Sequence, residues 1–122
     1  MSISIASRKS KGRNFQKWVA EKISDLLGIP WGKDELISSR PMGQSGTDVC
    51  LIGKAKEMFP YSIEIKCQET WSLPAWIKQA KSNKQKGTDW LLFIKKNRHE
   101  EILVMNAEVF FKLYSKILEN KQ

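Results

Sequence analysis

Three residues that could together hydrolyse a phosphodiester bond stand on two neighbouring apolar stretches of the chain. Asp48 begins one apolar run, and Glu64 and Lys66 lie in a second run that starts at Tyr61. An unpaired carboxylate is costly to bury, so Asp48 needs a reason to stand there. Asp48 and Glu64, with the Ile65 carbonyl as a further oxygen ligand, could hold Mg²⁺ or Mn²⁺. Such a metal polarises a phosphoryl oxygen and lowers the pKa of a bound water, while the Lys66 ammonium stabilises the growing negative charge or orients the nucleophile.

A β-hairpin would bring these residues together. Side chains alternate along a strand, so Glu64, Lys66 and Gln68 should share one face of a strand over residues 61–67, and the apolar side chains between them should face the core. A strand over residues 47–52 precedes it, and a turn that contains Gly53 and Pro60 joins the two. The hairpin would place Asp48 and Glu64 within reach of one cation.

The remaining elements follow from apolar spacing and from capping residues. They are a helix from Phe15 to Gly28, a short strand over 35–39, a polar loop over 40–46, a helix from the N-cap Ser72 to near Gly87, strands over 90–94 and 102–105, and a last helix that Asn106 caps. The last helix carries a continuous apolar stripe. The order α-β-β-β-α-β-β-α predicts an α/β (α+β) domain whose mixed β-sheet has about five strands.

Composition bounds the class of protein. The chain has 122 residues, which favours a single domain over residues 1–122, with residues 1–12 as a flexible basic N-terminal arm. Hydrophobic residues make up 41% of the chain, so we expect it to fold. Its 21 Lys and Arg outnumber 13 Asp and Glu, which gives a net charge of +8. A polyanion, nucleic acid first, is the expected partner, and the alternative is a basic protein that binds no anion.

Redox state and location follow from the same residues. Cys50 and Cys67 lie in apolar stretches and lack partners at metal-ligand spacing, so we expect them to be reduced core residues. His99 is the only histidine, which excludes a histidine-based nuclease and a zinc site. The sequence shows no apolar run of signal-peptide or membrane-span length. We expect a protein of the cytoplasm with no membrane partner.

The pattern Asp48 followed by Glu64-Ile65-Lys66 resembles the motif of the PD-(D/E)XK nuclease superfamily. The order of elements resembles that fold as well, from about Lys9 to Met105. The resemblance implies a restriction-endonuclease-like core in which Asp48 and Glu64 hold Mg²⁺, Lys66 supports the attacking water, and Mn²⁺ substitutes. The alternative is a surface Asp and an exposed Glu/Lys pair on an ordinary half-solvated strand.

Within the superfamily the chain resembles small Holliday junction resolvases and related phage-type endonucleases, which implies a prokaryotic or phage-infected cell. The likeness rests on Lys11-Gly12-Arg13 before a helix and on the loop from Arg40 to Gly46. Resolvases commonly carry a metal-linked Glu on the first helix, where this chain has Gln16. Gln16 borders the apolar stripe of that helix and can face the sheet, where its amide could hold a metal-bound water or a phosphate. The alternative is that Gln16 is a plain surface residue.

Further polar residues could border the site. Gln68 shares the face of Glu64, and Gln79 on the second predicted helix could touch phosphate or a metal-bound water. The loop resemblance suggests that Ser45 helps to bind the scissile phosphate. Candidate contacts to backbone phosphates are Lys9, Lys11, Arg13, Arg40, Lys78 and Lys81. For any one of these lysines the alternative is a solvated surface charge.

The sequence therefore predicts a metal-dependent DNA endonuclease that is structure-selective and resolvase-like, with no small-molecule cofactor beyond the metal. Symmetrical cutting of branched DNA needs two active sites, which implies a homodimer. A second hypothesis keeps the chemistry and changes the substrate, to a nicking, exonucleolytic or restriction-type nuclease. A third is a non-catalytic nucleic-acid-binding module, which would bind equally well without divalent metal.

Overall fold

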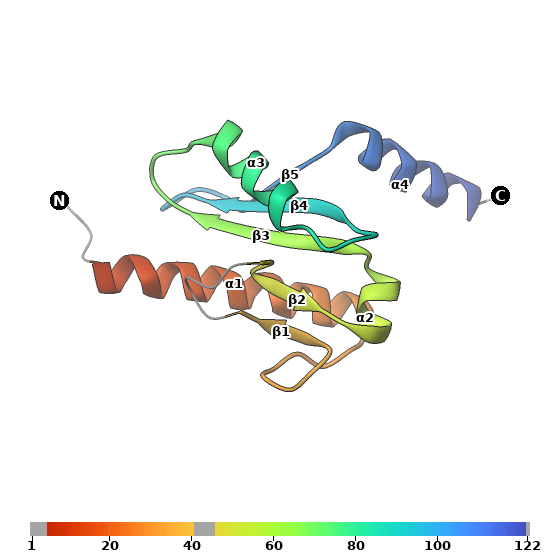
Figure 1. Cartoon of the computed structure of the whole chain (residues 1–122), viewed down its shortest axis with the longest axis horizontal. Helices are drawn as coiled ribbons and strands as arrows, with labels where there is room; N and C mark the ends of the chain where they lie inside the picture. Colours follow the sequence, from red (N-terminus) through yellow and green to blue (C-terminus); the bar gives the residue numbers. More distant parts are fainter. Residues whose placement is uncertain (1–4, 41–45, 122) are drawn as a thin grey trace.

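The computed structural model describes residues 5–40 and 46–121, which fold around one mixed sheet of five strands in the order β1-β2-β3-β4-β5 (Figure 1). The elements are α1 (Ile5–Leu27), β1 (Ile37–Ser39), β2 (Val49–Leu51), α2 (Gly53–Met58), β3 (Tyr61–Cys67), α3 (Leu73–Asn83), β4 (Asp89–Lys95), β5 (Ile102–Met105) and α4 (Ala107–Glu119). The prediction of an α+β fold with a mixed five-stranded sheet is confirmed. All five predicted strands form, within one or two residues of their expected bounds.

The strand β3 lies at the centre of the sheet. It pairs in parallel with β4 along its whole length, from Tyr61↔Asp89 to Cys67↔Lys95. Its other neighbour, β2, is antiparallel, as the predicted hairpin requires. The helix α3 is the crossover between the two parallel strands. Residues on β3 are therefore flanked by a strand on each side and by helices above and below.

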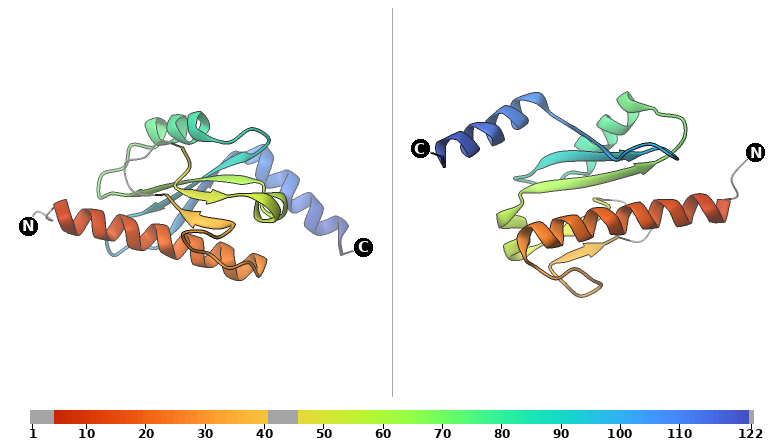
Figure 2. Two further views of the ribbon diagram at one scale, coloured as in Figure 1. Left: turned by 60° about the horizontal axis from the view of Figure 1, so that its bottom comes forward. Right: turned by 180° about the vertical axis from the view of Figure 1, so that it is seen from behind.

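The two faces of the sheet are covered by different helices (Figure 2). The apolar stripe of α1, which includes Phe15, Val19 and Ile23, is buried against Val49 and Ile63 of the sheet. On the opposite face, α3 packs Trp76 and Ala80 against alternate residues of β4, which are Trp90, Leu92 and Ile94. Because side chains alternate along β4, successive residues of this strand pack into two separate cores, one on each face of the sheet.

The N-terminal part of the chain differs from the prediction. We expected a flexible arm over residues 1–12 and a helix from Phe15, whereas α1 begins at Ile5. Residues 5–12 are therefore helical, and residues 1–4 lie outside the described part. This stretch extends past the apolar stripe, so it lacks the periodic apolar residues that reveal a packed helix.

Two connections also differ from the prediction. The expected turn between β2 and β3 contains the short helix α2, whose Ala55 is buried, so the order is α-β-β-α-β-α-β-β-α. Gly53 begins this helix at a φ of 56°, a left-handed conformation that glycine adopts easily. Ser72 is the N-cap of α3, but its side chain makes no capping hydrogen bond, and α3 ends at Asn83 rather than near Gly87.

The last helix, α4, forms as predicted but is not part of either core. The Asn106 side chain accepts a hydrogen bond from the Val109 N–H at 3.1 Å, which confirms the N-cap. No residue of α4 is buried, and the helix extends away from the sheet (Figure 1). Across residues 5–40 and 46–121, no helix combines the length and apolar character that a membrane crossing requires.

Candidate active site

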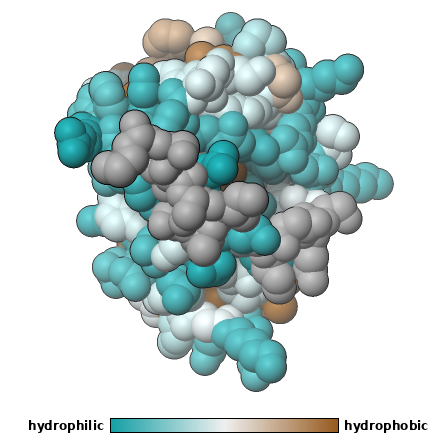
Figure 3. All heavy atoms as spheres, turned by 90° about the vertical axis from the view of Figure 1, so that its left-hand side faces the viewer, coloured by the Kyte–Doolittle hydropathy of each residue, from teal (hydrophilic) through white to brown (hydrophobic). Residues whose placement is uncertain are grey.

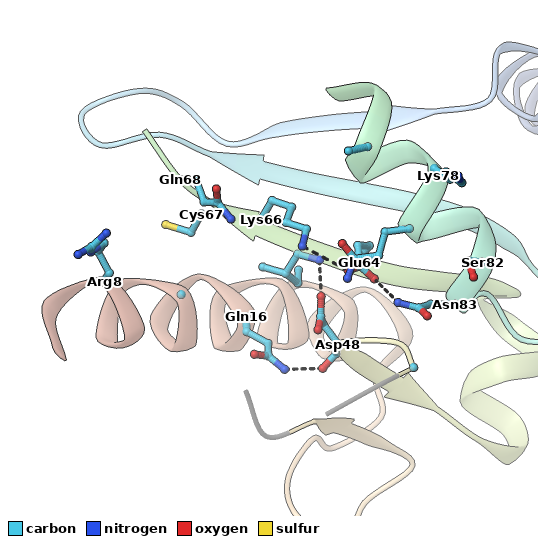
Figure 4. Close-up of a pocket in the computed structure, with 15 residues that line it drawn as sticks. Arg8, Gln16, Asp48, Glu64, Lys66, Cys67, Gln68, Lys78, Ser82 and Asn83 are labelled. Carbon is cyan, nitrogen blue, oxygen red and sulfur yellow. Dashed lines mark hydrogen bonds and ion pairs between the residues drawn. The ribbon is translucent and has the colours of Figure 1, made fainter. Parts of the chain in front are cut away.

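A pocket of about 700 Å³ opens between α1, the end of β3 and α3 (Figure 4). Its lining residues are Arg8, Gly12, Gln16, Gly46, Asp48, Glu64, Ile65, Lys66, Cys67, Gln68, Ala75, Lys78, Gln79, Ser82 and Asn83. The end of the molecule that carries the N-terminal part of α1 is hydrophilic over most of its described surface (Figure 3). The pocket brings together Asp48, Glu64 and Lys66, the residues on which the sequence prediction rests.

Asp48 is held against β3 by its backbone and by its side chain. Its N–H donates to the Ile63 carbonyl at 2.8 Å, and its Oδ2 accepts from the Ile65 N–H at 2.6 Å. Burial raises the pKa of the Asp48 carboxyl, and the Ile65 N–H and the charges of Lys66 and Arg40 oppose that rise. One carboxylate oxygen is thus fixed on the backbone of β3.

Glu64 is the more deeply buried carboxylate, with 3% of its surface exposed. Its Oε1 lies 3.9 Å from the Lys66 Nζ, and its Oε2 lies 3.5 Å from the Asn83 Nδ2, which donates to it. Burial, followed by the neighbouring charge of Asp48, raises the pKa of Glu64 to about 7. Asn83 and Lys66 lower it by less. The two carboxylates therefore share more negative charge than their neighbours neutralise.

A divalent cation fits this arrangement because it would neutralise two buried carboxylates at once. Within residues 5–40 and 46–121, no group of three or more His, Cys, Asp or Glu side chains could hold a metal. Asp48 and Glu64 are the two carboxylates that line the pocket, so the remaining ligands would be neutral oxygens such as the Ile65 carbonyl and water. The residues present thus suit a hard, partly hydrated ion.

Gln16 faces the sheet, as its place at the border of the helical stripe predicts. The side chain is 4% exposed. Its Nε2 donates to the Arg40 carbonyl at 2.7 Å and to the Asp48 carbonyl (Figure 4). The amide nitrogen therefore ties α1 to the backbone of Asp48. This tie positions Asp48, a role that the sequence did not indicate.

The other predicted contact residues divide into two groups. Gln68, Lys78 and Gln79 line the pocket. The basic residues Lys9, Lys11, Arg13, Arg40 and Lys81 lie outside its lining. Ser45 falls outside the described residues.

Two members of this second group interact with residues beside the pocket. The Arg40 Nε donates to the Thr47 carbonyl at 2.9 Å, and the Arg40 charge acts on Asp48. The charge of Lys11 acts on Cys67, whose pKa is raised by burial and by Glu69. Each of these cations therefore lies close enough to act on a residue that lines the pocket.

Sequence reasoning missed two residues of the site, Asn83 and Arg8. Asn83 lies four residues after Gln79, which places both on one face of α3, so helical spacing could have identified it. Arg8 lies in the stretch that was expected to be a flexible arm. Its position in the pocket follows from the early start of α1.

The family comparison agrees with this geometry. Residues 7–122 match the model of the family described as "Phage putative PDDEXK endonuclease". Neither the curated proteins nor the solved structures contain a significant match. The fold is restriction-endonuclease-like, with Asp48 beside the central strand that carries Glu64 and Lys66. The chain therefore belongs to this phage PDDEXK endonuclease family, within the PD-(D/E)XK nuclease superfamily.

Proposed function

We propose that the protein is a Mg²⁺-dependent DNA endonuclease that selects branched DNA, such as a four-way junction, and works as a homodimer in the cytoplasm. Mn²⁺ would substitute for Mg²⁺. The observation that carries the proposal is the buried Glu64 carboxylate, 3% exposed, beside Asp48 and 3.9 Å from the Lys66 Nζ. The two acids and Lys66 line a pocket of about 700 Å³, which leaves room for a phosphate.

Each residue would have a defined task in phosphodiester hydrolysis. Asp48, Glu64 and the Ile65 carbonyl would hold the metal, which polarises the phosphoryl oxygen and lowers the pKa of a bound water. Lys66 would stabilise the negative charge that develops as water adds to phosphorus and the bond to the leaving sugar oxygen breaks. Gln16 would keep Asp48 in place, and Gln68 would contact the water or phosphate at the outer edge.

The basic side chains around the pocket support a DNA substrate. Lys78 lines the pocket from α3 and Arg8 lines it from α1, on opposite sides of β3. Contacts of this kind bind backbone phosphates rather than bases, so we expect strong salt dependence and weak sequence preference. Two symmetrical cuts in a junction need two such sites, which is why the proposal includes a homodimer.

Cleavage of a labelled four-way junction tests the proposal, beside duplex, flap and single-stranded DNA, in Mg²⁺, Mn²⁺ and EDTA. We expect paired symmetrical cuts in the junction alone, lost in EDTA and in Asp48→Ala and Lys66→Ala. Lys54→Ala, an exposed position on α2, is the matched control and should cut like the wild type. Cutting of the other DNAs would overturn the junction selectivity. Salt-sensitive binding with intact DNA in every lane would overturn the enzyme.

A further inference from the structure

The helix α4 has a wide apolar face that no other described element covers. At about 100° per residue, its apolar side chains fill an arc of about 200° and its polar ones fill the rest. The large apolar side chains with 39–66% of their surface exposed are Phe110, Phe111, Leu113, Tyr114, Ile117 and Leu118. A face this wide exceeds the narrow seam that pairs two helices, so it suits a helix that lies on a surface.

The same chain offers an apolar surface without a partner. A hollow of about 170 Å³ lies beside the C-terminal half of α1, between Trp18 and Leu26 on the helix and Phe59 and Phe93. Leu26 is 71% exposed. Leu103, which pairs with Phe93 across β4 and β5, is 45% exposed. The hollow and its border are therefore apolar and open to solvent.

We propose that α4 of one copy packs into this hollow on a second copy, and that the reciprocal contact closes a two-fold dimer. Each copy supplies one helix and one hollow, so the interface is self-complementary and closes at two subunits. The inference rests on one part of the proposed function, the homodimer, and names the two surfaces that would form it.

The exposed apolar area of α4 is large enough for a dimer interface. Six half-exposed side chains of this size present on the order of 600 Å² on each copy. Two copies therefore reach the lower end of the roughly 1,200–2,000 Å² that stable interfaces bury.

The charges of α4 do not oppose this occupant. Its polar arc carries Glu108 and Glu119 together with Lys112 and Lys116, so the arc has no net charge. The arc lies opposite the apolar face, so a docked helix would keep these charges in solvent. The aromatic side chains would then lie at the centre of the interface and the charged ones outside it.

The arrangement leaves the active site open. The hollow uses the C-terminal half of α1, whereas the catalytic pocket uses Arg8, Gly12 and Gln16 of the N-terminal half. The helix α4 extends toward the end of the molecule opposite to the N-terminal part of α1 (Figure 1). Two copies joined in this way could each present a pocket to DNA.

Sedimentation or light scattering tests the inference without DNA or metal. We expect the wild type to be a dimer, and Phe111→Glu on α4 and Leu26→Glu at the hollow each to weaken association at least about tenfold. Both residues are mostly exposed, at 66% and 71%, so the variants should keep the fold by circular dichroism. Ser115→Glu, on the polar arc of α4, is the matched control and should remain a dimer.

Mixing the two weakened variants gives the decisive result. Phe111→Glu keeps an intact hollow and Leu26→Glu keeps an intact helix, so the mixture should form a heterodimer through one contact. A wild-type monomer would overturn both this inference and the proposed homodimer. A dimer that tolerates either variant, or a mixture that stays monomeric, would overturn the helix-in-hollow contact alone. Junction cleavage is measured separately, so failure of the dimer contact can be told apart from failure of the proposed nuclease activity.

Discussion

The carboxyl group of Glu64 makes the metal-free protein sensitive to pH. Its pKa is raised from 4.5 to about 7, first by burial and then by Asp48. The folded state therefore binds this proton more tightly than the unfolded state does. The resulting stability is fully present below about pH 4.5 and is lost as the pH rises through about 7. Above that pH the fold carries a buried charge that only a cation would neutralise.

Replacing Glu64 with glutamine should remove the loss of folding stability that ionisation of Glu64 causes. In EDTA at about pH 8, we expect Glu64→Gln to be more stable than the wild type by about 1–3 kcal/mol, and at about pH 5 the gain should largely disappear. Denaturant unfolding at both pH values measures the difference. Glu57→Gln, at an exposed position on α2, should show no such pH dependence. An equal gain at both pH values would mean that the Glu64 charge does not strain the fold.

At the level of single residues, the sequence indicated the acids and the lysine but not the groups that hold them. Strand alternation placed Glu64 and Lys66 on one face, and the cost of burying a charge singled out Asp48 at the start of an apolar run. The contacts of Gln16 with the Arg40 and Asp48 carbonyls join residues that are 24 and 32 positions apart. Such contacts depend on how α1 packs on the sheet, which local patterns do not specify.

Among the elements, α3 positions a side chain, Asn83, that contacts Glu64 directly. The Ser62 Oγ lies 2.7 Å from the Thr88 Oγ1 and accepts from the Gln85 N–H at 2.9 Å. These buried hydrogen bonds fasten the segment after α3 to β3, two residues from Glu64. The end of α3 is thereby held where the Asn83 amide reaches the Glu64 Oε2.

Removing that amide should loosen Glu64. We expect Asn83→Ala to weaken Mn²⁺ binding about tenfold, because groups that orient a metal ligand typically contribute that much. Calorimetry without DNA measures the binding, and single-turnover cleavage should fall in parallel. Ser72→Ala, at the exposed N-cap of α3 where the side chain makes no capping hydrogen bond, should bind Mn²⁺ like the wild type. Unchanged binding by Asn83→Ala would show that Glu64 keeps its position without α3.

Helices and strands could be predicted from the sequence where one of their faces is buried. The stripe of α1 from Phe15 onward and the five strands follow from apolar periodicity. The first turns of α1 and the helix α2 were missed, because polar stretches at the edge of the molecule leave no periodic trace. An amphipathic stripe also does not say what covers it, which is why the sequence of α4 is typical of a core helix although none of its residues is buried.

For the whole molecule, excess positive charge should govern how DNA binds. The net charge is +8, and the end that carries the N-terminal part of α1 is largely hydrophilic (Figure 3). Arg8 lines the pocket of the candidate active site, whereas Lys54 lies on α2, outside the pocket lining. Comparing substitutions of these two cations therefore distinguishes a direct phosphate contact in the pocket from the effect of net charge alone.

Arg8→Ala should weaken DNA binding and reduce its salt dependence. Loss of one phosphate contact lowers the slope of log K against log salt by about one. Lys54→Ala should change affinity only slightly and leave the slope in place. Fluorescence anisotropy across a salt series, in Ca²⁺ or EDTA, measures both. Equal effects of the two substitutions would indicate that DNA does not enter the pocket along α1.

The central place of β3 has a consequence for the order in which the protein is made. A growing chain carries Asp48, Glu64 and Lys66 by residue 66, but α3 and the parallel partner β4 follow only at residues 73–95. Until then, Glu64 lacks the helix that covers it and β3 lacks the strand to which all seven of its residues pair. We therefore expect chains cut short before β4 to lack nuclease activity, although they already carry Asp48, Glu64 and Lys66.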